Sequence, residues 1–270
     1  MNRLLQVTSK LKRTKKHIAD LEIEIRRFLD TNPYKVGTKR DPESRKLIYY
    51  VSSVQPTPDC LPLITGDAIQ NMMSALDHLA YQLVFLDTND RPPNPKWIYF
   101  PIQDTADKYE AQNRGKMEGA LQDTFDAIDA IKPYKGGNDL LWALFGLNNI
   151  EKHRLLFTVG SMFQSLDVGA HMTMMMNQTI SSQPDHPWHG KALPDIAIFL
   201  RPQDGLFPLK VGDELFTGAL DEEPNPKMQF RFNVALSEPE IIEAQSLLEM
   251  VHQMSNLVEG IVSSFAARLK

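Results

Sequence analysis

Residues 66 to 86 read GDAIQNMMSALDHLAYQLVFL, and this stretch gives the strongest indication of the fold. Its apolar side chains recur at three- and four-residue steps, or at their sum, which places them on one face of an α-helix. They are Ile69, Met72, Leu76, Leu79, Leu83 and Leu86. The stretch therefore predicts a long helix near residues 66–87 that packs this apolar stripe against other helices.

Three further segments repeat the same spacing and predict long helices near residues 4–30, 138–154 and 238–268. The last of them begins with Ser237 and Glu240, which have the spacing of a capping box, and Pro239 falls in the first turn. Long amphipathic helices of this kind are typical of a helical bundle.

Between residues 155 and 236 the helical spacing gives way to short runs rich in β-branched and aromatic residues. The runs expected to be strands are 155–160, 172–178, 196–200, 206–211, 215–220 and 229–236, and residues 47–51 form an earlier one. We therefore predict an α+β protein. A helical bundle domain would comprise residues 1–154 plus 237–270, and residues 155–236 would form an inserted antiparallel β subdomain.

Composition and charge exclude several classes of protein. The formal net charge is −5, with 42% apolar and 23% charged residues, which indicates a packed globular protein without a general basic coat for nucleic acid. Cys60 is the only cysteine, so no internal disulfide is expected. No apolar run is long enough for a membrane span, and the N-terminus lacks the apolar core of a secretory signal. We expect a cytoplasmic protein with no membrane association and no cofactor.

The first helix carries most of its basic residues in its N-terminal half: Lys10, Lys12, Arg13, Lys15 and Lys16. We interpret this run as a solvated helix face. Binding of RNA or of an acidic partner is the alternative.

A polar line runs beside the apolar stripe of the 66–87 helix. Asn71, Ser74, His78 and Gln82 follow one another at three- and four-residue steps, and Asp77 lies at the margin. An imidazole near a carboxylate can transfer protons, because imidazole titrates near neutrality and an acceptor orients its ring. We therefore predict catalytic roles for Asn71, Ser74, Asp77 and His78. The alternative is a buried histidine whose hydrogen bonds join two helices.

A second polar segment, NNIEKHR, ends the 138–154 helix. We predict that His153 and Arg154 take part in catalysis and that Asn148, Asn149 and Lys152 bind substrate. In the alternative interpretation, the three basic side chains stabilise the negative end of the helix dipole. The catalytic interpretation requires both polar segments to face one cleft.

Residues 66–79, together with 147–154, look like a family of uncharacterised bacterial proteins. The first stretch also resembles the motif of HEPN ribonucleases, in which an arginine, a polar residue, three further residues and a histidine lie on one helix of a small bundle. Ser74 and His78 match the polar residue and the histidine. Met73 stands where the motif has its arginine.

The resemblance implies an RNA-binding or metal-independent RNA-cleaving protein of a bacterial defence or stress system. It implies that His78 acts as general acid or base in a site shared across a homodimer. Because the arginine is absent, Lys152 or Arg154 would supply the positive charge, or the protein is a degenerate, non-catalytic relative.

Two other functions stay open. One is a non-enzymatic interaction protein that binds a protein partner. The other is a helix-bundle metal site that uses His78, His153 and a carboxylate such as Asp77 or Glu151.

Overall fold

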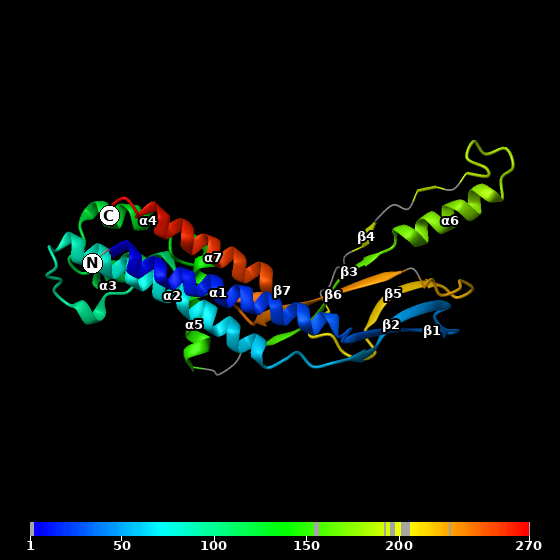
Figure 1. Ribbon diagram of the computed structural model, residues 1–270, viewed down its shortest axis with the longest axis horizontal. Helices are drawn as coiled ribbons and strands as arrows, with labels where there is room; N and C mark the ends of the chain where they lie inside the picture. Colours follow the sequence, from blue (N-terminus) through cyan, green and yellow to red (C-terminus); the bar gives the residue numbers. More distant parts are fainter. Residues whose placement is uncertain are drawn as a thin grey trace. The chain divides into compact units, whose positions relative to one another are not determined.

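The computed structural model describes residues 3–153, 157–191, 193–194, 198–200, 206–226 and 228–269, and it confirms the α+β class (Figure 1). The chain forms two compact units. We call Met1–Arg26, Pro58–Val159 and Leu236–Lys270 the helical unit, and Arg27–Thr57 and Gly160–Ala235 the β unit.

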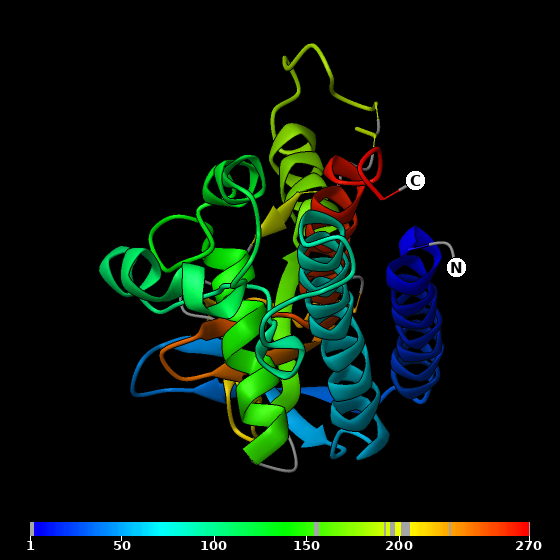
Figure 2. The same cartoon turned by 90° about the vertical axis from the view of Figure 1, so that its left-hand side faces the viewer.

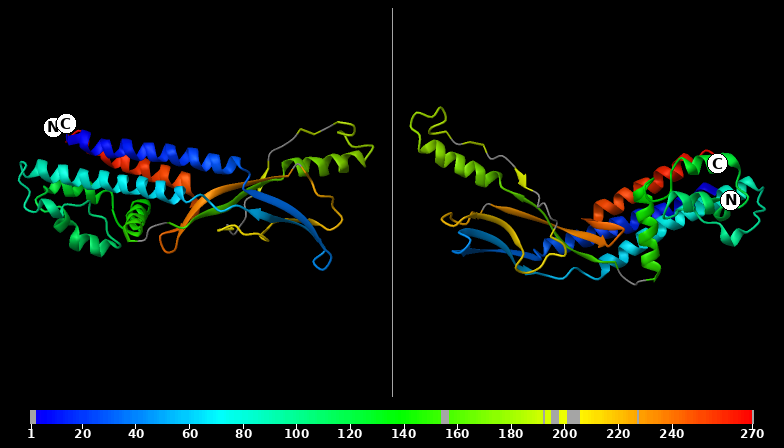
Figure 3. Two further views of the ribbon diagram at one scale, coloured as in Figure 1. Left: turned by 60° about the horizontal axis from the view of Figure 1, so that its bottom comes forward. Right: turned by 180° about the vertical axis from the view of Figure 1, so that it is seen from behind.

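The helical unit is built from long helices that the apolar spacing predicted. They are α1 (Arg3–Asp30), α2 (Cys60–Asp87), α5 (Asp139–His153) and α7 (Leu247–Ser264). Between α2 and α5 lie the 3₁₀ helix η1 (Pro95–Trp97), α3 (Ala106–Lys116) and α4 (Gln122–Asp129). Helices α1, α2 and α7 run side by side, and both chain ends lie at the same end of them (Figures 2 and 3).

Helix α2 forms the centre of this unit. Its predicted stripe is fully buried from Ile69 to Leu83, and it packs against α5 and α7. Gly66 allows α5 to approach closely, because a Cβ atom there would lie only 3.1 Å from Cγ of Glu151. The C-terminal end of α5 therefore lies beside the first turns of α2.

The strands form two sheets from distant parts of the chain, and most of them belong to the β unit. One sheet has the order β1-β2-β5, formed by Tyr34–Asp41, Lys46–Val54 and Glu214–Ala219. The other sheet has the order β4-β3-β6-β7, formed by Phe199–Leu200, Val159–Asp167, Gln229–Glu238 and Ile242–Ser246. The pairs β1–β2, β2–β5 and β3–β4 are antiparallel.

Strand pairing corrects the predicted domain boundaries. Residues 27–57 belong to the β unit, although we had placed them in the helical domain. Strand β1 was missed because its side chains are mostly exposed or half-buried and show no clear alternation. It forms a hairpin with β2, and β2 pairs with β5 of the inserted segment.

Residues 172–178 do not form the predicted strand but lie in helix α6 (Gly169–Ser181). Methionine is unbranched and favours helices, so a run of four methionines with one threonine suits a helix as well as a strand. The side chains of Met172, Met174, Met175 and Met176 are 41–51% exposed. In Figure 3, α6 extends beyond the strands of the β unit.

The C-terminal helix begins at Leu247, so the predicted start near residue 238 is wrong. Strand β6 continues through Glu238, whose buried carboxylate accepts a hydrogen bond from the backbone N–H of Thr158 at 2.7 Å. Glu240 then adopts a φ of 70° in the turn to β7. The spacing of Ser237 and Glu240 therefore produces a turn in place of a capping box.

The remaining strand predictions have mixed outcomes. Strands β2, β5 and β6 confirm the runs at 47–51, 215–220 and 229–236, whereas residues 206–211 form no strand. Of 155–160 only the end belongs to β3, and of 196–200 only Phe199 and Leu200 form β4; residues 154–156 and 195–197 lie outside the described residues. No helix in the described part of the chain has the length and apolar character needed to cross a membrane.

Candidate functional site: a groove over helix α2

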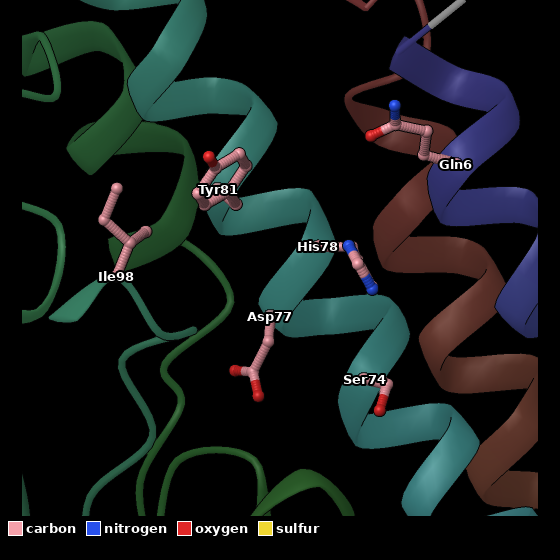
Figure 4. Close-up of a pocket in the computed structure, with 6 residues that line it drawn as sticks. All are labelled: Gln6, Ser74, Asp77, His78, Tyr81 and Ile98. Carbon is pink, nitrogen blue, oxygen red and sulfur yellow. The ribbon is translucent and has the colours of Figure 1, made fainter. Parts of the chain in front are cut away.

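A groove of about 290 Å³ lies over the outward face of α2 (Figure 4). Its floor consists of Ser74, Asp77, His78 and Tyr81, which share one face of the helix. Gln6 of α1 lies on one side and Ile98, just after η1, lies on the other. The groove thus brings together Ser74, Asp77 and His78, three of the catalytic candidates from the sequence.

The contact between α1 and α2 beside the groove is made by amides. Nε2 of Gln82, which is buried, donates to Oε1 of Gln6 at 2.7 Å. Asn71, the fourth candidate on α2, donates through Nδ2 to the backbone oxygen of Asp67 in its own helix at 2.7 Å, and it does not line the groove. His78 is half-buried, and its ring turns toward α1 (Figure 4).

Asp77 projects from α2 on the side opposite to His78 and α1 (Figure 4). There it holds the segment that carries Ile98. Its Oδ1 accepts a hydrogen bond from the backbone N–H of Phe100 at 3.0 Å. Burial raises the pKa of this carboxyl group, and the hydrogen bond from Phe100 and the positive charges of Lys152, His78 and Lys116 oppose the rise. A larger fraction of Asp77 is therefore protonated than of an exposed aspartate.

Lys116, at the end of α3, fixes the same segment from the other direction. Its Nζ donates to the backbone oxygen of Ile102 at 2.9 Å, and its own backbone oxygen accepts from the N–H of Tyr99 at 3.1 Å. Burial lowers the pKa of Lys116, while the nearby carboxylates of Asp77 and Asp104 oppose this change. The wall of the groove at Ile98 is thus held by charged groups on two helices.

The raised pKa of Asp77 predicts a pH dependence of stability. The folded unit keeps this proton at pH values where the unfolded chain has lost it, so the stabilisation present below the ordinary pKa of 3.8 is lost as the pH rises through the folded-state pKa. An Asp77→Asn variant keeps an acceptor for Phe100 and does not ionise. We expect its free energy of unfolding, relative to the wild type, to increase from pH 4 to pH 8 in urea titrations.

The Asp104→Asn variant is the control, because the pKa of Asp104 is shifted in the opposite direction to that of Asp77. The hydrogen bond from Lys108 is the main reason that the pKa of Asp104 lies below its usual value. Its contribution to stability is therefore present above the ordinary pKa and lost at lower pH. The free energy of unfolding of this variant should be lower than that of the wild type at neutral pH, and the difference should become smaller in acid. Parallel pH curves for Asp77→Asn and the wild type would contradict the assignment of Asp77.

The second predicted polar segment meets the groove only in part. Asn148 is 2% exposed, with no hydrogen bond to its Oδ1 from any described residue, and Asn149 is half-buried. Lys152 is exposed, and its charge acts on Asp77. The side chain of His153 and the whole of Arg154 lie outside the described residues. Glu151 packs at Gly66, about 18 Å along α2 from His78 at 1.5 Å per residue.

No family model, curated protein or solved structure matches this chain. The resemblance to the HEPN motif therefore remains a prediction from Ser74 and His78. Met73, at the position of the motif arginine, is only 5% exposed and belongs to the core. An arginine side chain there would have to leave the core to reach the groove, so any cation that binds a ligand must come from another helix.

Four residues at the groove were not predicted: Gln6, Tyr81, Ile98 and Lys116. Tyr81 could have been found, because it continues the three- and four-residue steps of Ser74, Asp77 and His78. The other three come from distant segments, and nothing in their local sequence indicates the groove.

The metal-binding alternative remains a prediction. Among the described residues, no three histidine, cysteine, aspartate or glutamate side chains are grouped so that they could hold a metal ion. The proposed ligand set, however, includes His153, whose side chain lies outside them.

Proposed function

We propose that the helical unit binds RNA and cleaves it without a metal ion, with the groove over α2 as its active site. One observation carries this proposal: Ser74, Asp77 and His78 line a single groove that is open to solvent. They combine a hydroxyl, a carboxyl with a raised pKa and an imidazole, which are groups suited to proton transfer and hydrogen bonding to a phosphate.

The proposed reaction is attack of a ribose 2′-oxygen on the adjacent phosphorus. The new P–O2′ bond forms as the P–O5′ bond breaks, so one group must accept the 2′ proton and another must supply a proton to the 5′-oxygen. In the proposed step His78 accepts the first proton, and Asp77 supplies the second in the fraction of molecules in which its carboxyl group is protonated, a fraction that burial increases. The two side chains project to opposite sides of helix α2 (Figure 4), so a phosphate bound over the helix would lie between them. Ser74 donates a hydrogen bond to a phosphate oxygen.

Electrostatics near the groove support a phosphate ligand. The charges of Lys116 and Lys152 act on Asp77, and burial shifts Asp77 toward its neutral form. Both effects reduce the repulsion that an ionised carboxylate would exert on an approaching phosphate.

Incubation of the purified full chain with single-stranded RNA in excess chelator tests the proposal. We expect fragments with 2′,3′-cyclic phosphate and 5′-hydroxyl ends, because these are the products of attack by the 2′-oxygen. DNA of the same sequence lacks that oxygen and should remain intact. Cleavage that requires a divalent metal, or products with 5′-phosphate ends, would contradict the mechanism.

A second candidate function is protein interaction, which the methionines of α6 favour. Exposed methionines adapt to many apolar surfaces and are common at binding sites. Both candidates include a homodimer, so we expect light scattering to give twice the 30.7 kDa of one chain. A dimer formed through α6 should dissociate in a Met174→Gln, Met175→Gln double variant. A dimer formed by the helical unit should not.

A further inference from the structure

We infer that the α1 side of the groove is a phosphate-binding strip in which Lys10 and Arg13 hold the RNA backbone beside His78. The inference rests on the proposed function for the identity of the ligand. It supplies the positive charge that the motif arginine would provide, since Met73 stands at the position of that arginine.

Contacts at two points show that α1 and α2 are antiparallel. Near the start of α1, Gln6 accepts from Gln82, and Nη1 of Arg3 donates to Oε1 of Gln82 at 3.4 Å. Further along α1, Nδ1 of His17 lies 4.0 Å from Oδ2 of Asp67, near the start of α2. Residue numbers therefore rise along α1 as they fall along α2.

Between these two points, Lys10 and Arg13 lie on the flank of α1 that faces α2. Gln6, Lys10, Arg13 and His17 follow one another at steps of four, three and four residues, which keeps them on one side of the helix. Lys10 is four residues from Gln6, and His78 is four residues from Gln82. Because both helices rise about 1.5 Å per residue, Lys10 is level with His78 and Arg13 is nearly level with Ser74.

The other residues of the basic run, Lys12, Lys15 and Lys16, point elsewhere. Nζ of Lys15 pairs with Glu259 of α7 at 2.7 Å, on the opposite flank. Lys12 and Lys16 are exposed and lie on the outward face, between the two flanks. The basic run of α1, which we interpreted from the sequence as one solvated face, therefore points in three directions. Of its residues, only Lys10 and Arg13 lie on the flank that faces α2, beside the groove.

Lys10 is half-buried and Arg13 is exposed, and neither forms an ion pair with any described residue. Their charges are thus available to a ligand. Long flexible lysine and arginine side chains can contact phosphates that lie over a groove, and such contacts position a nucleic acid without reading its sequence. The carboxylate of Asp67 beside His17 marks the end of the strip, because it would repel a further phosphate.

Two double variants of equal charge test the strip. Lys10→Gln with Arg13→Gln removes two charges from the flank that faces α2, and Lys12→Gln with Lys16→Gln removes two from the outward face. Both are made in a His78→Ala background, so that RNA stays intact. Binding of fluorescently labelled single-stranded RNA is followed by anisotropy at several salt concentrations, after thermal unfolding has shown that both variants fold.

We expect the first double variant to lose about tenfold or more in affinity and to lower the salt slope by about 1.4, the value for two phosphate contacts on a single strand. The matched variant should stay within about twofold of its parent, because its charges do not contact the bound strand. Equal losses of RNA affinity in the two double variants, or no RNA binding by the His78→Ala parent, would contradict the proposed phosphate-binding strip.

Binding and cleavage fail separately in this design. If the two double variants bind alike while the wild-type chain still cleaves RNA, the strip is wrong and the proposed reaction stands. If the wild-type chain cleaves nothing but binding depends on Lys10 and Arg13, the reaction is wrong and the strip stands.

Discussion

A His78→Ala variant should cleave RNA about 10² to 10⁴ times more slowly than the wild-type chain, the range typical of losing a general base. The expected loss is large because His78 is the only histidine among the six residues that line the groove. The measurement is the rate of fragment formation under single-turnover conditions in chelator. RNA affinity should change little, since the expected phosphate contacts lie on other residues.

His252→Ala is the matched control. His252 is exposed on α7 and belongs to the same unit, so its loss should leave the cleavage rate unchanged. Equal rates from the wild type and His78→Ala would identify the activity as a contaminant and would remove the enzymatic interpretation. The Ser74→Ala variant should cleave RNA more slowly than the wild type but faster than His78→Ala, because it loses one hydrogen bond to the phosphate, worth about 1 kcal/mol.

An Asp87→Ala variant should lose about 2–4 kcal/mol of unfolding free energy, because it removes one partner of a largely buried ion pair. The side chain of Asp87 is 2% exposed, and its Oδ1 pairs with Nη2 of Arg268 at 2.9 Å. Its Oδ2 accepts from the backbone N–H of Leu121 at 2.9 Å and from the hydroxyl of Thr124 at 2.5 Å. One carboxylate thus joins the end of α2 to the start of α4 and to the C-terminus.

Urea unfolding followed by tryptophan fluorescence measures this loss. Trp188 belongs to the β unit, so a Trp188→Phe background leaves Trp97 and Trp142 as reporters of the helical unit. Asp90→Ala is the control: the side chain of Asp90 is 63% exposed and pairs with Arg3, and such surface pairs contribute at most about 1 kcal/mol. Similar losses in the two variants would show that Asp87 does not join these elements.

The elements that could be predicted from the sequence are those in which local pattern and tertiary environment agree. The stripe of α2 and the alternation of Gln229 to Leu236 each have one apolar face, and burial of that face selects the helix or the strand. The predictions for α6 and for the start of α7 were wrong because the local pattern in both places fits more than one structure. The methionines of α6 suit a strand or a helix, and Ser237 and Glu240 have the spacing of a cap but lie at the end of a strand that Thr158 holds.

Only part of the candidate site could be predicted from the sequence. Ser74, Asp77 and His78 could be grouped from sequence because they lie within two turns of one helix. The expected contribution of α5 could not be judged, since two helices far apart in sequence can meet at any height and rotation. Glu151 in fact packs three turns away from His78, and only the charge of Lys152 is felt at Asp77.

The α+β class, the long helices and the polar line on α2 follow from the amino-acid sequence, because the period of apolar residues fixes both the element and the face that it buries. The surroundings of that line follow from tertiary packing alone. Gln6 of α1 lies on one side, Ile98 lies on the other in a segment held by Asp77 and Lys116, and Met73 is buried below. These neighbours depend on how separate helices pack, and packing is set by contacts between residues far apart in the chain, which no local period encodes.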